Sequence, residues 1–288
     1  MTFNAGLYNV EPHVAEIYDQ SETYTDDVEL IRRLIGERGP WRILEPFCGT
    51  GRILIPLALD GHELVGLDGA QGMLARARAK VAYGCGASCG CGTSCGCGTS
   101  CGCGASALPN AVQQRIILSE ADVTAAEWPR GFDLVILGGN CFYELATSQE
   151  QEGCIASAAA SLKSGGYVYV DNNHMEGDLD ESWREPGVSQ RGLNGTCADG
   201  TRVESTAETI WYDAPRRLIK FRRRTRVTLP GGRVVEQECV QQKHPPSTGE
   251  VRGWLEAHGF EVEHLYGDRA GNPYAESSKR AIFWARKL

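Results

Sequence analysis

The first candidates for chemistry are two carboxylates and two glycines, spaced as a nucleoside ligand would require. Glu45 opens the segment Glu-Pro-Phe-Cys-Gly-Thr-Gly, whose glycines are Gly49 and Gly51. Glycine lets a backbone turn tightly and approach a ligand closely. Asp68 ends the apolar segment Glu-Leu-Val-Gly-Leu-Asp, where a carboxylate can accept hydrogen bonds from both hydroxyls of a ribose. This spacing predicts a nucleoside-binding site.

The same segment argues against a dinucleotide as the ligand. The pyrophosphate-binding fingerprint Gly-x-Gly-x-x-Gly needs a third glycine, and Leu54 stands at that position. The Glu45 carboxylate would also repel phosphates at the start of the loop. It suits a ligand that has cationic groups and no phosphate, such as S-adenosylmethionine (SAM) with its ammonium and sulfonium.

Several segments resemble, in order, the motifs of the class I SAM-dependent methyltransferases. Residues 45–51 fit motif I of that family, Glu/Asp-x-x-x-Gly-x-Gly. Residues 67–74 are similar to its Asp-x-Ser-x-x-Met-Leu segment, although Ala70 replaces the serine. The remaining likenesses are to the adenine-contacting segment (120–123), to the fourth strand (132–136) and to the turn Leu-x-Pro-Gly-Gly (162–166, with Ser164 for proline).

A shorter likeness narrows the family. Residues 137–142, Leu-Gly-Gly-Asn-Cys-Phe, look most like the segment after the fourth strand of the glycine and sarcosine N-methyltransferases, where the equivalent of Asn140 faces the substrate. A three-stranded insertion before the last helix recurs in the amino-sugar N-methyltransferases. The resemblance implies SAM as methyl donor, S-adenosylhomocysteine (SAH) as product and a small-molecule acceptor. An amine nitrogen is the favoured acceptor atom, with oxygen or carbon as alternatives.

The resemblance also implies which residues bind the cofactor. In this family the N-terminal segment folds over the cofactor, which selects Tyr18 and Tyr24, with core packing as the alternative for either. Asp122 would contact the exocyclic amine of adenine, and Val123 its ring. The whole expected set is Tyr18, Tyr24, Glu45, Phe47, Cys48, Gly49, Gly51, Asp68, Met73, Asp122, Val123 and Gly139.

Methyl transfer from a sulfonium is an in-line displacement on an activated donor, so the protein mainly supplies orientation and exclusion of water. An amine must be neutral to attack, and a nearby base can take its proton. His174 is the general-base candidate, with a surface-loop histidine as the alternative. Asn140 and Tyr143 are the other catalytic candidates, and Asn172 is a candidate for binding the substrate.

The basic run 216–226 looks at first like a nucleic-acid patch. Strand alternation instead places four of its cations on one face, where glutamates of neighbouring strands could pair with them. The cations are Lys220, Arg222, Arg224 and Arg226, and the glutamates are Glu204, Glu208, Glu236 and Glu238. Arg223 falls on the opposite, apolar face, where it could hold a substrate carboxylate bidentately.

Alternating strand and helix patterns predict the elements that position these residues. We expect an α/β fold: a doubly wound, Rossmann-like, seven-stranded and mostly parallel sheet, with an antiparallel three-stranded subdomain (195–244) over the substrate side. Expected strands are 42–45, 63–67, 114–120, 132–137, 167–171, 260–266 and 280–286, and 201–212, 217–229 and 233–243 in the subdomain. Expected helices are 10–38, 52–60, 71–83, 149–162 and 248–258, and residues 164–166 are expected to form a turn.

The composition sets the broad class. A chain of 288 residues can form one domain, 1–288. A net charge of −8 gives no reason to expect a nucleic-acid partner. No apolar run approaches the about 20 residues of a membrane span, and the N-terminal residues show no signal-peptide pattern. We expect a cytoplasmic protein and leave its oligomeric state open.

Residues 84–106 form a cysteine- and glycine-rich insert. Three copies of a Ser-Cys-Gly-Cys-Gly-x hexapeptide occupy 88–105, and seven of the twelve cysteines lie between Cys85 and Cys103. The spacing could place thiolates around a soft metal ion such as Zn²⁺ or Cu(I), and a flexible repeat is the alternative. A metal- or redox-responsive binding protein on a methyltransferase scaffold is therefore the second function we consider. The expected topology places the insert at the edge of the sheet opposite the ligand, so we assign no metal to the active site.

Overall fold

The computed structural model describes residues 12–83, 108–173 and 184–288, and leaves the side chain of Tyr143 undescribed. Its main sheet has seven strands in the order β10-β11-β5-β4-β1-β2-β3. The strands are β1 (Arg42–Pro46), β2 (Glu63–Asp68), β3 (Ile116–Glu120), β4 (Phe132–Leu137), β5 (Leu162–Asn173), β10 (Phe260–Tyr266) and β11 (Arg280–Lys287). Strands β1 to β5 pair in parallel, and β11 runs antiparallel to β5 and β10. The expected α/β fold with a mostly parallel sheet is confirmed.

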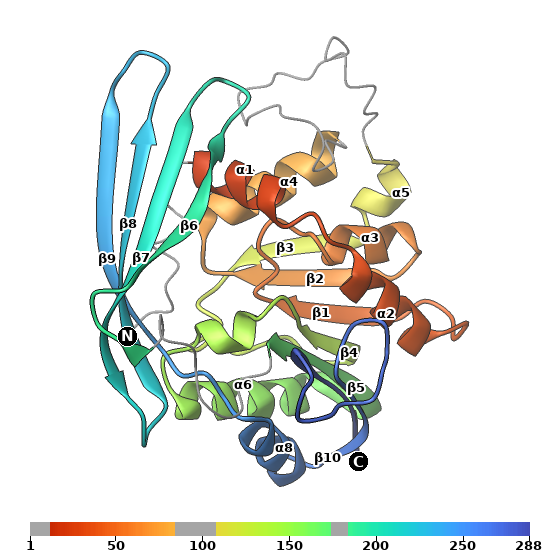
Figure 1. The fold of residues 1–288 in the computed structure, drawn as a ribbon. Helices are drawn as coiled ribbons and strands as arrows, with labels where there is room; N and C mark the ends of the chain where they lie inside the picture. The colour runs from red at the N-terminus through yellow and green to blue at the C-terminus, as the bar shows by residue number, and fades with distance from the viewer. Residues whose placement is uncertain (1–11, 84–107, 174–183) are drawn as a thin grey trace.

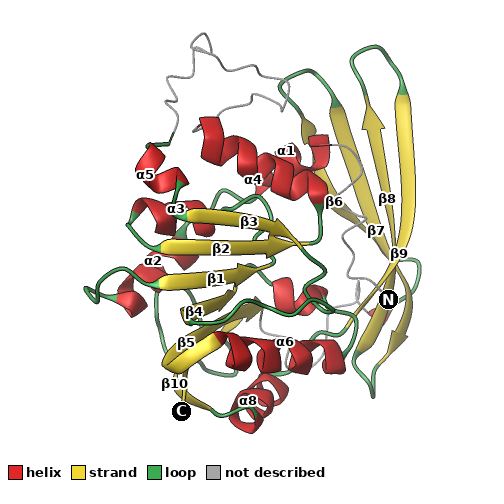
Figure 2. Cartoon of the chain, turned by 180° about the vertical axis from the view of Figure 1, so that it is seen from behind, coloured by secondary structure: helices red, strands yellow, loops and turns green. Residues whose placement is uncertain are grey.

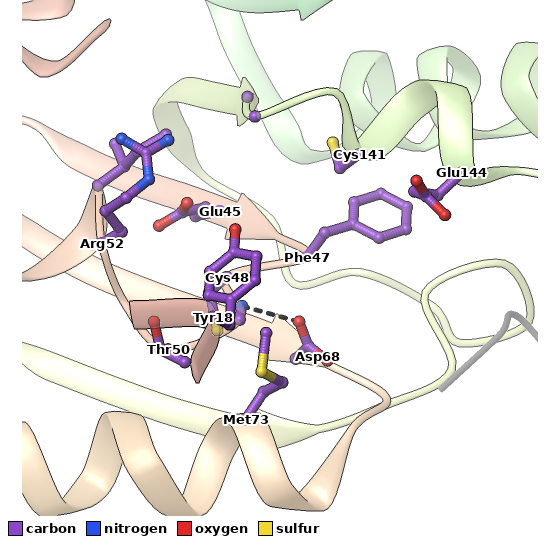
Figure 3. Close-up of a pocket in the computed structure, with 14 residues that line it drawn as sticks. Tyr18, Glu45, Phe47, Cys48, Thr50, Arg52, Asp68, Met73, Cys141 and Glu144 are labelled. Carbon is purple, nitrogen blue, oxygen red and sulfur yellow. Dashed lines mark hydrogen bonds between the residues drawn. The ribbon is translucent and has the colours of Figure 1, made fainter. Parts of the chain in front are cut away.

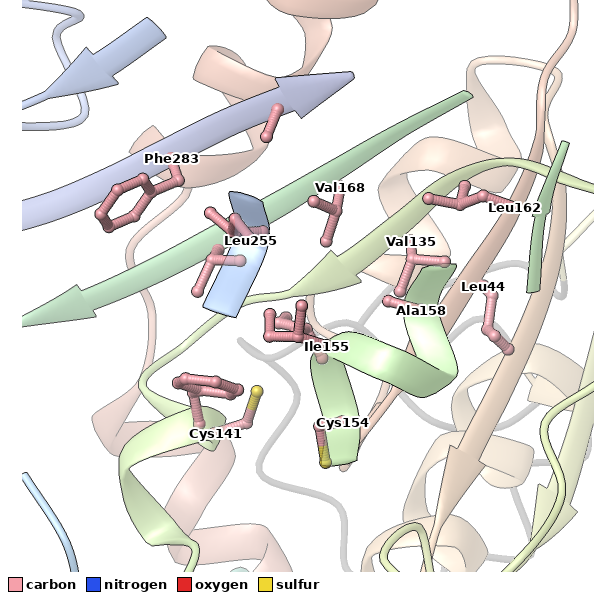
Figure 4. Close-up of a cluster of buried hydrophobic side chains, with 14 of the residues drawn as sticks. Leu44, Val135, Cys141, Cys154, Ile155, Ala158, Leu162, Val168, Leu255 and Phe283 are labelled. Atoms are coloured by element: carbon pink, nitrogen blue, oxygen red, sulfur yellow. The ribbon is translucent and has the colours of Figure 1, made fainter. Parts of the chain in front are cut away.

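Helices cover both faces of this sheet (Figure 1). They are α1 (Pro12–Ser21), α2 (Asp26–Ile35), α3 (Leu54–Leu59), α4 (Gln71–Tyr83), α5 (Asn110–Gln113), α6 (Ser148–Ser161) and α8 (Thr248–Ala257), with the short 3-10 helix η2 (Cys141–Glu144) after β4. Alternate residues of one strand enter opposite cores. Leu44 packs in the core that α6 and α8 cover (Figure 4), while Ile43 packs in the core under α2 and α3.

The expected helix 10–38 is wrong as a single element, because the structure has two helices there. α1 ends at Ser21, and α2 begins at Asp26. Asp26, Asp27 and Glu29 give α2 an acidic first turn, which favours a new start because a helix N-terminus attracts negative charge. The break lets α1 lie beside α4 and β6 (Figure 1), and this places Tyr18 over the carboxyl ends of the main sheet.

The second sheet has four strands, so the prediction of a three-stranded subdomain is wrong. They are β6 (Ser189–Thr196), β7 (Arg202–Asp213), β8 (Leu218–Thr228) and β9 (Val234–Lys243), in that order and antiparallel. The sheet therefore starts before residue 195. The sequence of β6, Ser-Gln-Arg-Gly-Leu-Asn-Gly-Thr, has weak strand propensity. Its glycines allow close packing: a Cβ on Gly195 would lie 2.9 Å from Cδ1 of Ile17.

Another expectation, the turn at 164–166, falls inside β5. Gly165 has φ 76° there, and the register between β4 and β5 shifts close by. The pairing with β4 is parallel on both sides of this shift, so the predicted turn is an irregularity within one strand. The cysteine-rich insert, 84–106, lies outside the described residues, and so does His174.

The outer face of the second sheet carries the predicted ion pairs. Arg222 and Arg224 contact both Glu208 and Glu238, and Arg226 contacts Glu236. Two details differ from expectation. Glu204 contacts Arg202, and Lys220 lies over the Trp211 ring. Within the described ranges, none of the helices combines the length and the apolar character that a membrane span requires.

The carboxyl ends of β1, β2 and β3 point toward the second sheet (Figure 2). Loops that follow parallel strands meet at this edge, which is where α/β proteins bind ligands. The second sheet therefore stands on the side of the main sheet where ligands bind in α/β proteins.

Candidate functional site

The loop after β1 folds back onto the end of β2. The backbone N–H groups of Phe47 and Cys48 both donate to the carbonyl of Leu67, over 2.7 and 2.9 Å. Phe47 has φ 77°, Gly49 φ 53° and Gly51 φ 77°, a left-handed conformation that favours glycine. At Gly49 and Gly51 the residue type therefore fits the backbone conformation, while Phe47 adopts it without being a glycine.

Asp68 holds this loop to the start of the next one. Its Oδ2 accepts a hydrogen bond of 2.8 Å from the N–H of Gly49 (Figure 3). Its Oδ1 accepts one of 2.8 Å from the N–H of Ala70. Burial raises the pKa of Asp68, and the two backbone hydrogen bonds oppose that shift. Each oxygen keeps a second lone pair, so the carboxylate can still accept from ligand hydroxyls.

Glu45 is a buried carboxylate of the site with one oxygen that lacks a described partner. It is 5% exposed, and its Oε2 has no hydrogen-bond partner among the described residues. Burial raises its pKa to about 8, while the charge of Arg52 acts in the opposite direction. A buried carboxylate without a partner is costly. A cationic group of a ligand would remove that cost.

These residues share one cavity at the ends of β1 and β2 (Figure 3). Its volume of about 110 Å³ is below the about 300–1,000 Å³ usual for small-molecule sites, so a nucleoside must extend beyond it or displace a covering side chain. The predicted residues that line it are Tyr18, Glu45, Phe47, Cys48, Gly49, Asp68, Met73 and Gly139.

Four predicted cofactor residues are not on the wall of this cavity. Tyr24 packs between two guanidinium groups, at 4.0 Å from Arg52 and 4.3 Å from Arg269. Gly51 shapes the loop. Asp122 accepts hydrogen bonds from Thr124, at 3.1 Å from its N–H and 2.7 Å from its hydroxyl. Val123 is buried in the core. Their predicted contacts with the cofactor stay predictions.

The predicted catalytic and substrate residues are placed differently. Asn140, at φ 62°, accepts hydrogen bonds at Oδ1 from the N–H of Asn173 (2.8 Å) and from Arg280 Nη2 (3.0 Å). This contact fastens the end of β4 to the end of β5. Asn172 is 3% exposed, and neither polar atom of its side chain has a partner among the described residues. His174 and the Tyr143 side chain lie outside the described part of the chain.

The sequence did not predict the rest of the cavity wall. Arg52 is the clearest case, because its position directly after motif I was the only signal. It binds Asp27 through two hydrogen bonds of 2.9 and 2.6 Å. Burial of Arg52 opposes its charged form, but Asp27 outweighs that effect and the pKa of Arg52 is raised. The other unpredicted wall residues are Thr50, Ile53, Gly138, Cys141 and Glu144.

A second cavity, of about 470 Å³, adjoins the first and shares Tyr18 and Glu144 with it. It reaches from α1 and η2 to the inner face of the second sheet, where Arg223 lies. Arg223 donates from Nε to Gln241 Oε1 over 3.2 Å. Strand alternation thus predicted the correct face for Arg223. The full lining is Tyr18, Ser21, Glu22, Glu144, Arg191, Gly192, Leu193, Asn194 and Arg223.

The described cysteines give no metal centre. Cys48, Cys141, Cys154, Cys197 and Cys239 are free thiols, and burial raises the pKa of each. In the ranges that the structure describes, no group of three or more His, Cys, Asp or Glu side chains could hold a metal ion.

Comparison with known sequences gives two informative likenesses, and no family model matches the chain. A protein of Geobacillus sp. (strain WCH70), provisionally named a methyltransferase, is 23% identical over 291 residues, which cover 100% of both chains. A stretch of 62 residues is 37% identical to the 23S rRNA (uracil(1939)-C(5))-methyltransferase RlmD of Nitrosococcus oceani. That stretch covers 22% of this chain and only 14% of RlmD.

Solved structures share the fold over almost the whole chain. A SAM-dependent methyltransferase from Clostridium acetobutylicum superimposes with a TM-score of 0.65 at 14% identity, over 92% of both chains. The sugar N-methyltransferase KedS8 from Streptoalloteichus sp. superimposes with a TM-score of 0.64 at 19% identity, over 93% of this chain and 89% of KedS8. The motif order, the sheet topology and these superpositions agree: the chain has the fold of the SAM-dependent methyltransferases.

Proposed function

We propose that the protein is a SAM-dependent methyltransferase that transfers the methyl group to a small-molecule acceptor, with an amine nitrogen as the acceptor atom. One observation carries the cofactor assignment. Glu45 presents a buried carboxylate oxygen without a described partner in the same cavity as Asp68. An ammonium for Glu45 and ribose hydroxyls for Asp68 are the two chemical groups that SAM combines.

When bound, SAM supplies a methyl group activated by its positively charged sulfur. The residues of the chain then have to bind and orient the two reactants. Glu45 would hold the ammonium, Asp68 the ribose, and the loop with Gly49 would let the backbone lie against the ligand. Phe47, Ile53 and Met73 would exclude water, which strengthens the electrostatic contacts inside the site.

The acceptor would occupy the second cavity. The neighbouring Arg223 supports our proposal that a substrate carboxylate or another anionic group binds there, and the unpartnered amide of Asn172 makes it the second candidate for substrate binding. The likeness to KedS8, a sugar N-methyltransferase, supports nitrogen as the acceptor atom. Asn140, Tyr143 and His174 remain our proposed catalytic residues from the sequence. Oxygen and carbon are the alternative acceptor atoms.

Calorimetric titration with SAM and SAH tests the cofactor assignment. We expect both to bind the wild-type protein, and the Asp68→Ala variant to lose at least about 100-fold in affinity because two charge-assisted ribose contacts disappear. Asp68→Asn separates loop folding from binding, since it can keep an acceptor for the N–H of Ala70. Asp60→Ala is the control, because Asp60 is the C-cap residue of α3 and lines neither cavity. Binding that is equal in Asp68→Ala and Asp60→Ala would refute the assignment.

The alternative of a metal- or redox-responsive binding protein rests on the insert 84–106, which lies outside the described residues. Metal analysis of the protein purified under reducing conditions tests it directly. A bound soft metal near one equivalent would support a metal role for the insert. Loss of that metal without loss of SAM binding would show that the two properties are separate.

A further inference from the structure

Glu144 lies where the two cavities meet. It is the last residue of η2, the short helix that follows β4, and it lines both cavities. The cofactor proposal does not use it, since Glu45 and Asp68 account for the ammonium and the ribose. A carboxylate at the junction would face the acceptor on one side and the methyl donor on the other.

Lys243 holds Glu144 in this place. Its Nζ donates to Oε1 of Glu144 over 2.5 Å, joining β9 of the second sheet to η2 of the main domain. The Lys243 side chain is only 6% exposed and lies over the Phe221 ring, 5.7 Å from the centroid. Burial lowers the pKa of Lys243 and Glu144 opposes that shift, so the carboxylate stabilises the charged ammonium.

The second carboxylate oxygen of Glu144 makes no hydrogen bond within the described residues. Oε2 is buried and has no hydrogen-bond partner among the described residues. A buried carboxylate oxygen that lacks a donor costs free energy. Because this oxygen belongs to a cavity-lining residue, an N–H or O–H donor of a bound acceptor would satisfy it.

We propose that Glu144 is the catalytic carboxylate that binds the acceptor amine and takes its proton, and that Lys243 is the residue that positions it. This inference rests on the proposed methyltransferase function. We therefore replace His174, the general-base candidate from the sequence, with Glu144, which lies on η2.

The proton and the electrons balance in this scheme. A bound alkylammonium gives one proton to Glu144 Oε2, which leaves a neutral amine. The nitrogen lone pair forms a bond to the methyl carbon, the carbon–sulfur bond breaks, and its electron pair stays on sulfur. The methylated ammonium leaves, and Glu144 gives its proton to water. The net products are the N-methylated ammonium, SAH and one proton.

Steady-state methylation with named amine probes tests the proposal. Glycine, ethanolamine and glucosamine serve as probes, and SAH formation is the readout. We expect Glu144→Gln to lower kcat/KM for the best probe at least about 100-fold, within the range that general acid–base catalysis supplies, with SAH affinity changed less than about twofold. Glu152→Gln is the matched control, because Glu152 lies on α6 and pairs with His258 outside both cavities.

Two variants of Lys243 test whether this residue positions the Glu144 carboxylate or only stabilises the fold. Lys243→Met should lower kcat more than it raises KM, since Glu144 would lose its orientation while the cavity keeps its shape. Lys243→Arg should restore most of kcat, because the charge and a donor return. Equal activity in Glu144→Gln and Glu152→Gln would overturn the proposal, and so would failure of every amine probe to bind the SAH complex. Failure of SAH to bind the wild-type protein would instead refute the proposed function itself.

Discussion

The proposed cofactor cavity and the proposed acceptor cavity are neighbours, but different parts of the chain form them. The first is lined mainly by the loops after β1 and β2, which lie close in sequence and are locked by backbone hydrogen bonds to Leu67 and Asp68. The second collects side chains from α1, η2, β6 and β8. The residues of the first cavity are therefore mostly close to one another in the sequence, whereas the residues of the second come together only when the chain folds. Mutations should separate them accordingly.

The largest expected effect concerns the buried charges behind the cofactor cavity. Asp27 has a side chain that is 0% exposed; it holds Arg52, a residue of the cavity wall, and lies 3.6 Å from Arg269. Asp27→Ala would leave buried cations without this partner, which typically costs about 3–5 kcal/mol. Urea denaturation should show that loss, and SAH affinity should fall because Arg52 is released.

Asp26→Ala is the matched control for this experiment. Asp26 is the neighbouring residue and contacts Arg269 at 3.0 Å, but its side chain is 59% exposed. Exposed pairs contribute about 0–1 kcal/mol. If both variants lose the same free energy of unfolding, the cofactor cavity does not depend on a buried ion-pair network, and the contrast between the cavities is weaker than we argue.

A smaller effect is expected at Gly66, which supports the motif I loop from behind. A Cβ at this position would lie 2.7 Å from Cys48 Sγ and 2.7 Å from Leu54 Cδ1. Gly66→Ala should reduce the free energy of unfolding by about 1–3 kcal/mol, as overpacking does, and weaken SAH binding by displacing Cys48. Gly153→Ala on α6, where a Cβ meets nothing within 4 Å, should not destabilise the protein. Thermal and urea denaturation compare the two.

The contrast between the cavities also explains what the sequence could predict. Period-two and helical patterns located the strands of the main sheet. The segment from Glu45 to Asp68 predicted five residues of the first cavity wall: Glu45, Phe47, Cys48, Gly49 and Asp68. β6 was missed because its glycines and asparagine are poor strand formers that pairing with β7 overrides. The sequence did not point to Glu144 because its position in the site depends on a hydrogen bond from Lys243, 99 residues away. No local pattern reports such a pair.

A pH experiment sharpens the role of Glu45. Its pKa is raised from 4.5 to about 8, so between these values the folded protein keeps a proton that the unfolded chain has lost. This group's contribution to stability therefore falls as the pH rises through that interval. An ammonium ligand favours the ionised form, so SAM binding at pH 7 should release close to one proton and strengthen as the pH rises toward 8.

Calorimetry in buffers with different ionisation enthalpies measures that proton release. Glu45→Gln has no carboxyl group to ionise and should abolish it. Glu63→Gln, at the exposed start of β2, should leave it unchanged. Proton release that persists in Glu45→Gln would mean that another group titrates on binding, and the unpartnered Glu45 oxygen would then not be the contact for the ligand ammonium.

The smallest effect is expected on the outer face of the second sheet, opposite the acceptor cavity. Arg226 contacts Glu236 at 3.6 Å, and both side chains are more than half exposed. Solvent screens such a pair, so Arg226→Gln should change neither the melting temperature nor SAH formation measurably. Arg223→Gln, three residues earlier on the inner face, should raise the KM of an anionic acceptor. One strand carries both arginines, so the two variants can be compared directly. A higher KM in Arg223→Gln alone would support a place for the inner face of the second sheet in the active site. An equal KM in the two variants would exclude Arg223 from the active site.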